Sequence, residues 1–183
     1  MTHPPSQCGL LALSALWCRQ MEDNTVENLV SALGDSARAP RAAQQLSELV
    51  QAGAAATLLE ALLARLLEGV HGAGARRAVA KLLSKATFAQ GAEARPHLPK
   101  IVASTARALG DGEATVREAF ATALADAARH TSQDATGKEL LSLLVRPLLR
   151  ELDQPNRPLQ HGVALAIREV IRVLQPAQLR PAF

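Results

Sequence analysis

Aromatic residues are scarce in this chain of 183 residues, which has three phenylalanines, one tryptophan and no tyrosine. Its core must therefore be built from leucine, alanine, valine and isoleucine, and alanine favours helices that pack closely. Phe88, Phe120 and Phe183 are scattered along the chain. This scatter argues against a helical protein that stacks aromatic side chains on a pigment or a damaged nucleobase.

Cysteine is equally scarce, and long hydrophobic runs are missing. Cys8 and Cys18 fall in one expected helix, where their separation of about 15 Å is too long for a disulfide. This spacing indicates a reducing compartment. No apolar run approaches the roughly 18 residues that cross a membrane, and no lysine or arginine precedes the apolar segment that begins at Cys8. We therefore expect a cytoplasmic protein that makes no contact with a membrane.

The sequence also lacks the patterns that mark catalytic or metal sites. Its five histidines show no ligand spacing and stand beside no cysteine cluster, so we expect no metal and no cofactor. No strand precedes Gly69, Gly72 and Gly74, and no serine lies on a glycine elbow. The balance of 20 basic and 17 acidic residues gives a net charge of +3, too small to indicate nucleic-acid binding. These observations predict a binding protein rather than an enzyme.

What the chain does contain is a series of amphipathic helices. The stretch from Pro96 to His130 shows the pattern best, because two apolar stripes with helical spacing flank Gly110, Asp111 and Gly112. Such a helical hairpin cannot bury both stripes alone, so it needs further copies on both sides. No run of alternating apolar and polar residues predicts a strand. We therefore predict an all-α fold.

The copies are present as four hairpins. We predict a right-handed α-solenoid with approximate repeats at 23–52, 53–90, 94–130 and 137–175, preceded by a tail and capping helix at 1–22 and followed by a tail at 176–183. The capping helix spans Gln7 to Gln20. In the second repeat the leucine stripe continues to Val70, and in the fourth Pro147 is expected to kink the first helix.

The repeats are in phase with one another. Arg41, Arg76, Arg117 and Gln160 each stand near the start of a second helix, at spacings of 35, 41 and 43 residues. A small residue follows two positions later in every copy, namely Ala43, Ala78, Ala119 and Gly162. We expect neighbouring helices to approach closely at these small residues.

The third hairpin resembles a HEAT repeat. The resemblance is carried by Leu98, Pro99, Leu109, Asp111, Val116, Arg117 and Ala119. In that family the turn aspartate and the arginine of the second helix form a ladder along the solenoid. Here Asp35 with Arg41 and Asp111 with Arg117 match, whereas Arg76 lacks an aspartate and Asp153 is followed by Gln160.

A narrower resemblance covers about Asn24 to Ile171. The order of hairpins is similar to the N-terminal, TOG-like helical domain of the plant Tortifolia/Spiral microtubule-associated proteins. Its distinctive residues are Pro96, Leu98, Lys100, Ile101 and Val102, the run Val116-Arg117-Glu118-Ala119, the run Leu144-Val145-Arg146-Pro147-Leu148, and Gln154, Asn156, Arg157, Leu159, Gln160, Gly162, Ala164 and Leu165. The resemblance implies a cytoskeletal protein that binds tubulin or microtubules through the turns within the hairpins.

Candidate partner-binding residues follow from the positions of these turns. They are Arg38, Arg41, Arg76, Arg77, Asn156 and Arg157. Arg41, Arg76 and Arg117 are in repeat phase, so an internal role, pairing with aspartates or capping carbonyls, is favoured for them. Arg38, Arg77 and Arg157 lie outside that phase and are the better surface candidates. A generic HEAT scaffold for another protein partner remains the alternative, and exposed large apolar residues on the second helices would favour it.

Overall fold

The computed structural model describes residues 25–131 and 137–174, and the elements in these two ranges are helical. The prediction of an all-α fold is therefore confirmed. The expected capping helix at Gln7–Gln20, with Trp17, and the expected tail at 176–183 lie outside the described residues.

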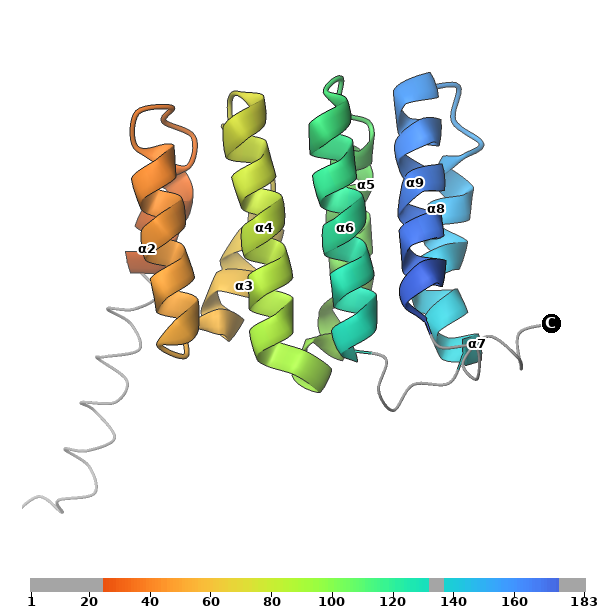
Figure 1. Cartoon of the computed structure of the whole chain (residues 1–183), viewed down its shortest axis with the longest axis horizontal. Coiled ribbons are helices and arrows are strands. Elements are labelled where there is room, and N and C mark those ends of the chain that lie inside the picture. Colours follow the sequence, from red (N-terminus) through yellow and green to blue (C-terminus); the bar gives the residue numbers. More distant parts are fainter. Residues whose placement is uncertain (1–24, 132–136, 175–183) are drawn as a thin grey trace, which may run out of the picture.

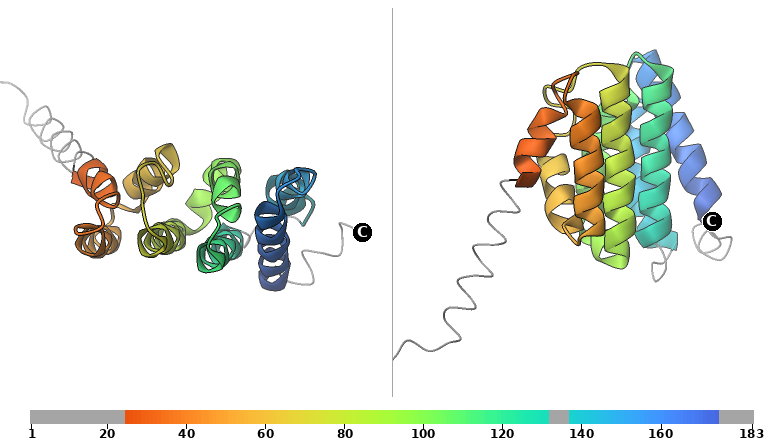
Figure 2. Two further views of the ribbon diagram at one scale, coloured as in Figure 1. Left: turned by 90° about the horizontal axis from the view of Figure 1, so that it is seen from above. Right: turned by 60° about the vertical axis from the view of Figure 1, so that its left-hand side comes forward.

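The helices lie in two layers (Figures 1 and 2). One layer is a row of the longer helices α2 (Ala39–Gln51), α4 (Ala73–Gln90), α6 (Ala114–Thr131) and α9 (Arg157–Val173). The other layer contains the helical residues 25–32, α3 (Ala55–Ala64), α5 (Leu98–Leu109), and the sequence of α7 (Gly137–Leu140), a π-helical segment (Leu141–Val145) and α8 (Arg146–Glu151). A 3₁₀ helix, Gly91–His97, connects α4 to α5. Each helix of the second layer is thus followed in the chain by its partner in the first.

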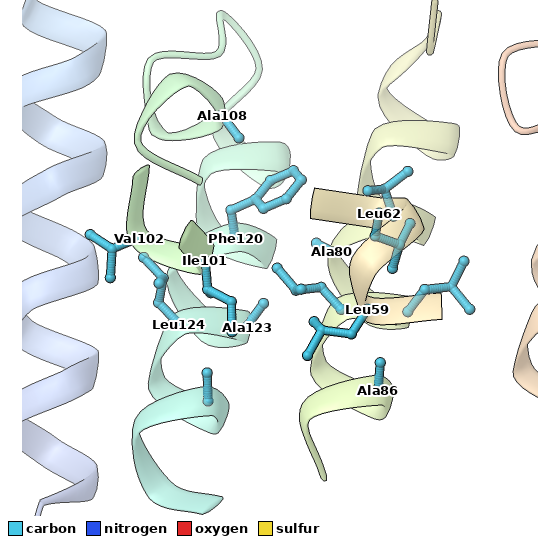
Figure 3. Close-up of a cluster of buried hydrophobic side chains, with 14 of the residues drawn as sticks. Leu59, Leu62, Ala80, Ala86, Ile101, Val102, Ala108, Phe120, Ala123 and Leu124 are labelled. Carbon is cyan, nitrogen blue, oxygen red and sulfur yellow. The ribbon is translucent and has the colours of Figure 1, made fainter. Parts of the chain in front are cut away.

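The core fills the space between the layers. Phe120 of α6 is fully buried at its centre, surrounded by aliphatic side chains of α3, α4 and α5 (Figure 3). The predicted stripe of α5 is buried along its whole length, from Leu98 to Leu109. Thr105, the one polar member of that stripe, donates its hydroxyl hydrogen bond to the carbonyl of Ile101 at 2.7 Å. Its burial therefore leaves no polar atom unpaired.

The helix of the second hairpin is shorter than its apolar stripe predicts. Helix α3 ends at Ala64, and Leu67 takes a left-handed conformation with φ of 66°. The chain then folds back, so that Leu66 and Leu67 pack against the core and Val70 is buried. The stripe correctly marked these residues as core, but a loop rather than a longer helix buries them.

Pro147 changes the fourth hairpin in the expected place. A proline cannot donate the backbone bond that a continuous α-helix would need. The structure accommodates it with the π-helical segment Leu141–Val145, in which Arg146 donates its backbone N–H to the carbonyl of Leu141. Pro147 then occupies the first turn of α8, where its missing donor costs least.

Gly162 confirms the expected close approach of neighbouring helices. A Cβ atom at this position of α9 would overlap the backbone carbonyl of Leu109, at the end of α5. The clash would involve backbone atoms, which cannot move aside as a flexible side chain can. The contact fixes the distance between the last two hairpins.

We expect the substitution Gly162→Ala to lower the free energy of unfolding by about 1–3 kcal/mol, because the added methyl overpacks a rigid contact. Urea denaturation would measure it. Gly112→Ala is the matched control, because a Cβ at Gly112 meets nothing within 4 Å. Equal stability of the two variants would contradict the close approach.

Candidate functional site

The connections from the second layer to the first lie at one edge of the molecule (Figure 1). They are loop I (33–38), loop II (65–72), loop III (110–113) and loop IV (152–156). We refer to them together, with the adjoining first turns of α2, α4, α6 and α9, as the loop edge. The amino ends of these four helices lie at the loop edge, where each carries partial positive charge.

Loops I and II are held together through their backbones. A Cβ at Gly34 would lie 2.6 Å from the carbonyl oxygen of Gly69, closer than a side chain allows. Only glycine at position 34 permits this approach. The two loops are therefore fixed side by side without any help from a partner.

An ion pair links the first turn of α4 to loop III. Arg76 Nε lies 2.7 Å from Asp111 Oδ2, and Arg76 Nη2 donates a hydrogen bond of 3.1 Å to Oδ1. The side chains are 22% and 11% exposed, so the pair is largely shielded from water. Arg117 Nη1 donates to the backbone carbonyls of Asp111 at 2.6 Å and Gly112 at 3.0 Å. Arg76 and Arg117 thus hold loop III in place.

This geometry refines the expected ladder. The carboxylate of Asp111 pairs with Arg76 of the preceding hairpin, whereas Arg117 of its own hairpin binds backbone carbonyls. Asp35 accepts a backbone hydrogen bond from Ala37 and lies 3.3 Å from Arg38 rather than pairing with Arg41. The single rung in the described residues therefore connects adjacent hairpins.

Asp111→Ala should destabilise the protein by about 1–3 kcal/mol, which is the cost of breaking a buried ion pair reduced for its partial exposure. Thermal or urea unfolding would show this loss. Asp35→Ala removes the equivalent carboxylate from loop I, where the paired Arg38 is 77% exposed. That control should change stability by less than about 1 kcal/mol; a larger loss than in Asp111→Ala would exclude the rung as a stabilising contact.

Loop IV is held by amide side chains. Asn156 caps α9, because its Oδ1 accepts the backbone N–H of Leu159 at 3.2 Å. Gln160 Nε2 donates to the carbonyls of Leu152 and Gln154, both at 3.0 Å. Gln160 therefore holds loop IV through two backbone carbonyls, as Arg117 holds loop III. Asn156, a candidate partner-binding residue, already has this structural role.

The remaining candidates project into solvent. Arg38, Arg41, Arg77 and Arg157 are all exposed. Arg38 forms an exposed ion pair with Asp35, which contributes little to stability. Within residues 25–131 and 137–174, no ion pair or hydrogen bond engages the guanidinium groups of Arg41, Arg77 and Arg157. Their charges are free for a partner.

Several of these arginines stand where a helix would prefer an acid. Arg38 is the N-cap residue of α2, Arg41 lies in its first turn, and Arg157 is the first residue of α9. Neither helix has an acidic residue in its first turn. A cation near a helix amino end opposes the helix dipole. These arginines therefore do not stabilise the helices at whose amino ends they lie.

Charge is unevenly distributed along the loop edge. Loop III carries Glu113, which is exposed, and loop IV carries exposed Asp153 beside Arg157. Loops I and II also carry exposed acids, Asp35 and Glu68, but together with the starts of α2 and α4 they hold more arginines, namely Arg38, Arg41, Arg65, Arg76 and Arg77. Between the two loops is a hollow of about 460 Å³, lined by Ser36, Ala39, Pro40, His71, Gly72, Gly74, Ala75 and Ala78. These small side chains leave the backbone of loops I and II open to a partner surface.

The described residues contain no group of three or more histidine, cysteine, aspartate or glutamate residues arranged to hold a metal ion. No helix among them is long and apolar enough to cross a membrane.

Comparison with known proteins gives one match. The profile of a family described as TORTIFOLIA1 N-terminal matches residues 22–181. No curated protein and no solved structure matches the chain. The matched range includes all the loops of the loop edge.

Proposed function

The chain belongs to the TORTIFOLIA1 N-terminal family, which suggests a microtubule-associated protein, and on this premise we propose that it binds tubulin through the loop edge. This family is of a structural type and is not known for catalysis. We accordingly propose a non-enzymatic binding module of the cytoplasmic cytoskeleton. Arg38, Arg41, Arg77 and Arg157 are the proposed contacts.

The proposal includes the nature of the repeats. We propose that the helical pairs are HEAT repeats of the TOG-like kind, stacked as a right-handed α-solenoid over about residues 23–175. Two features of the described residues support this: the layered rows of helices, and the equivalent contacts of Arg117 and Gln160, which both donate to backbone carbonyls of the preceding loop. Repeats of this kind form extended binding surfaces because each copy presents its loop at the same edge.

One observation carries the functional proposal: unpaired arginines share a single edge with the amino ends of the longer helices. Tubulin is an acidic partner, and a positive edge would accelerate and orient its binding. Arg76 and Asn156 support the same surface indirectly, because they hold loops III and IV in position.

Co-sedimentation with microtubules tests the proposal. The folded chain should pellet with microtubules at low ionic strength, and the bound fraction should fall as salt is added, because exposed charges are screened. A folded chain that stays in the supernatant at low salt would rule out microtubule-lattice binding. Gel filtration with unpolymerised tubulin dimers would then decide whether any tubulin binding remains.

A scaffold for another protein is the second candidate, and one observation favours it. Of the exposed large apolar residues, Phe88 belongs to α4 and Ile171 to α9, with exposed fractions of 67% and 44%, and none lies in a loop of the loop edge. Exposed apolar side chains often mark interaction sites. Recovery of a stable complex without tubulin from a pull-down would favour this candidate.

A further inference from the structure

Helix α4 carries a stripe of unpaired cations that ends in an exposed aromatic ring. Arg77, Lys81 and Lys85 follow one another at intervals of four residues, and Phe88 comes three residues later. All four are exposed, Phe88 to 67%. In the described part of the chain, no carboxylate lies within ion-pair distance of these cations. We call these four residues the α4 stripe.

A groove runs beside the α4 stripe, between α4 and α2, which lie next to each other (Figure 1). Its upper part is the hollow between loops I and II. Its lower part, of about 470 Å³, lies between the two helices, and Ala78 borders both parts. The lower part is lined by Ala43, Ser47, Glu48, Ala78, Lys81 and Lys85, among others. The small and apolar members of this lining are Ala43, Ala78 and Leu82, and both lysines come from α4.

Acidic side chains on the neighbouring helices form no ion pair with the cations of the α4 stripe in the described residues. Exposed Glu48 of α2 lines the lower part of the groove and keeps its charge, because its hydrogen bond comes from the neutral amide of Gln44. Asp126 of α6 accepts a hydrogen bond from Ser84 and pairs with Arg129. Lys85 donates to the hydroxyl of Ser47, which places its ammonium group over the groove without neutralising it. The positive charge of the α4 stripe is therefore available to a ligand.

Phe88 closes the lower end of the stripe. Its ring meets that of His130 edge-on, with centroids 4.8 Å apart and an interplanar angle of 76°. This contact holds the ring in place while leaving most of it in water. A fixed, exposed phenylalanine provides an apolar anchor for a partner residue.

We propose that the α4 stripe docks an extended acidic segment of a partner protein, with acidic side chains over the cations and an apolar side chain over Phe88. Cations four residues apart on a helix are separated by about 6 Å along its axis. Alternate side chains of an extended chain are about 6.6–6.8 Å apart on one face. The spacing therefore matches a segment with acids at alternating positions, in which the next residue on the same face is apolar.

The chemistry favours a peptide over single-stranded nucleic acid. A nucleic-acid groove combines cations with several aromatic platforms on which successive bases stack. The α4 stripe offers one aromatic ring, at its end, and a groove lined in part by alanine. This surface meets the loop edge at Arg77 and at the hollow between loops I and II, but the inference does not depend on the proposed tubulin binding. Arg77 adjoins both surfaces, so the test leaves it unchanged.

The test uses a dye-labelled heptapeptide with glutamates at its first, third and fifth positions and leucines at its last two. Fluorescence anisotropy at low salt should show saturable binding to the whole chain. Lys81→Glu with Lys85→Glu should raise the Kd about ten-fold or more, as expected for reversing two exposed charges. A peptide with lysine in place of glutamate should bind this double variant better than it binds the unmodified chain.

Arg168→Glu with Arg172→Glu is the matched control. These residues have the same spacing on α9 and the same exposure, but both lie within ion-pair distance of Glu169. The control should leave the Kd within about two-fold, and Phe88→Ala should raise it roughly three-fold or more. Circular dichroism would confirm that each variant is folded.

Several results would overturn the inference. They are no peptide binding at low salt, an equal loss in the α9 control, tighter binding of a heptanucleotide than of the peptide, or a dimer in sedimentation that the lysine double variant abolishes.

Microtubule co-sedimentation distinguishes this inference from the proposed tubulin binding. The lysine double variant should still pellet with microtubules if the unmodified chain does, and loss of both activities would show that the stripe is not a separate surface. If the unmodified chain does not pellet with microtubules, the proposed microtubule binding fails, and the peptide measurements alone decide whether the α4 stripe binds an acidic segment.

Discussion

Replacing Arg38, Arg41 and Arg157 together by glutamate is expected to raise the Kd for microtubules roughly 100-fold at low ionic strength. Each reversal removes an attraction and adds a repulsion, together about 0.5–1 kcal/mol, so three such changes correspond to about 1.5–3 kcal/mol, and the upper end of this range is roughly 100-fold. The three guanidinium groups come from loop I and from the first turns of α2 and α9, and all are exposed. The loss should shrink as salt is added, because screening weakens the same attraction in the unmodified chain.

The substitution should not harm the fold. Arg41 and Arg157 lie in the first turns of α2 and α9, where a glutamate suits the helix dipole better than an arginine does. Loss of binding in this variant would therefore come from the surface. The exposed residue Arg77 is left unchanged, so that the result concerns the loop edge and not the α4 stripe.

A matched triple variant gives the control. Lys100→Glu, Arg146→Glu and Arg172→Glu change the net charge by the same amount at exposed positions of α5, α8 and α9 away from the loops. Microtubule binding should fall much less in this variant. If both variants bind equally, net charge rather than the loop edge determines affinity, and the proposed contacts are wrong.

Phe120→Ala should lower the free energy of unfolding by about 3–5 kcal/mol. Phe120 is fully buried where α6 meets α3, α4 and α5 (Figure 3). Its removal leaves a cavity that three neighbouring helices would have to collapse together to fill. Since domains are typically stable by only about 5–15 kcal/mol, the variant should unfold at a much lower urea concentration.

Phe88→Ala is the control for this measurement. Phe88 is 67% exposed, so its truncation should change stability by less than about 0.5 kcal/mol. If Phe120→Ala gives no soluble protein, Phe120→Leu should fold and show a smaller loss. Equal stability of the unmodified chain and Phe120→Leu or Phe120→Ala would contradict a single core shared by the layers.

The sequence predicted the helices well where the stripes were continuous. Leu98–Leu109 and Ala114–Thr131 follow directly from apolar spacing and glycine positions. The end of α3 was missed, because an apolar run does not reveal whether a helix or a folded-back loop buries it. Leu67 shows this best, since its left-handed conformation ends a stripe that continues to Val70.

The internal contacts of the candidate residues could be predicted only in part. Repeat phase indicated an internal role for Arg76 and Arg117, and both have one. Repeat phase also predicted an internal role for Arg41, but its guanidinium group has no ion-pair or hydrogen-bond partner in the described residues. The pairing of Arg76 with Asp111 could not be read from the sequence, because it depends on how one hairpin is offset against the next.

Sequence reasoning missed the α4 stripe, although its signal was present. Arg77, Lys81 and Lys85 at intervals of four residues, with Phe88 three residues on, predict a basic helical face with an apolar end. What the sequence alone could not give is the exposure of Phe88. In an aliphatic chain with few aromatic residues, a phenylalanine is expected in the core, as Phe120 is.

The central claim is that the loop edge contacts tubulin, and hydrogen–deuterium exchange of the chain with and without tubulin dimers tests it most directly. At short labelling times, protection should appear in loops I and II, in loop IV and in the first turns of α2, α4 and α9. Protection confined to α3, α5 and α8, or to the opposite edge, with the loops exchanging as fast as in the free chain, would contradict the claim.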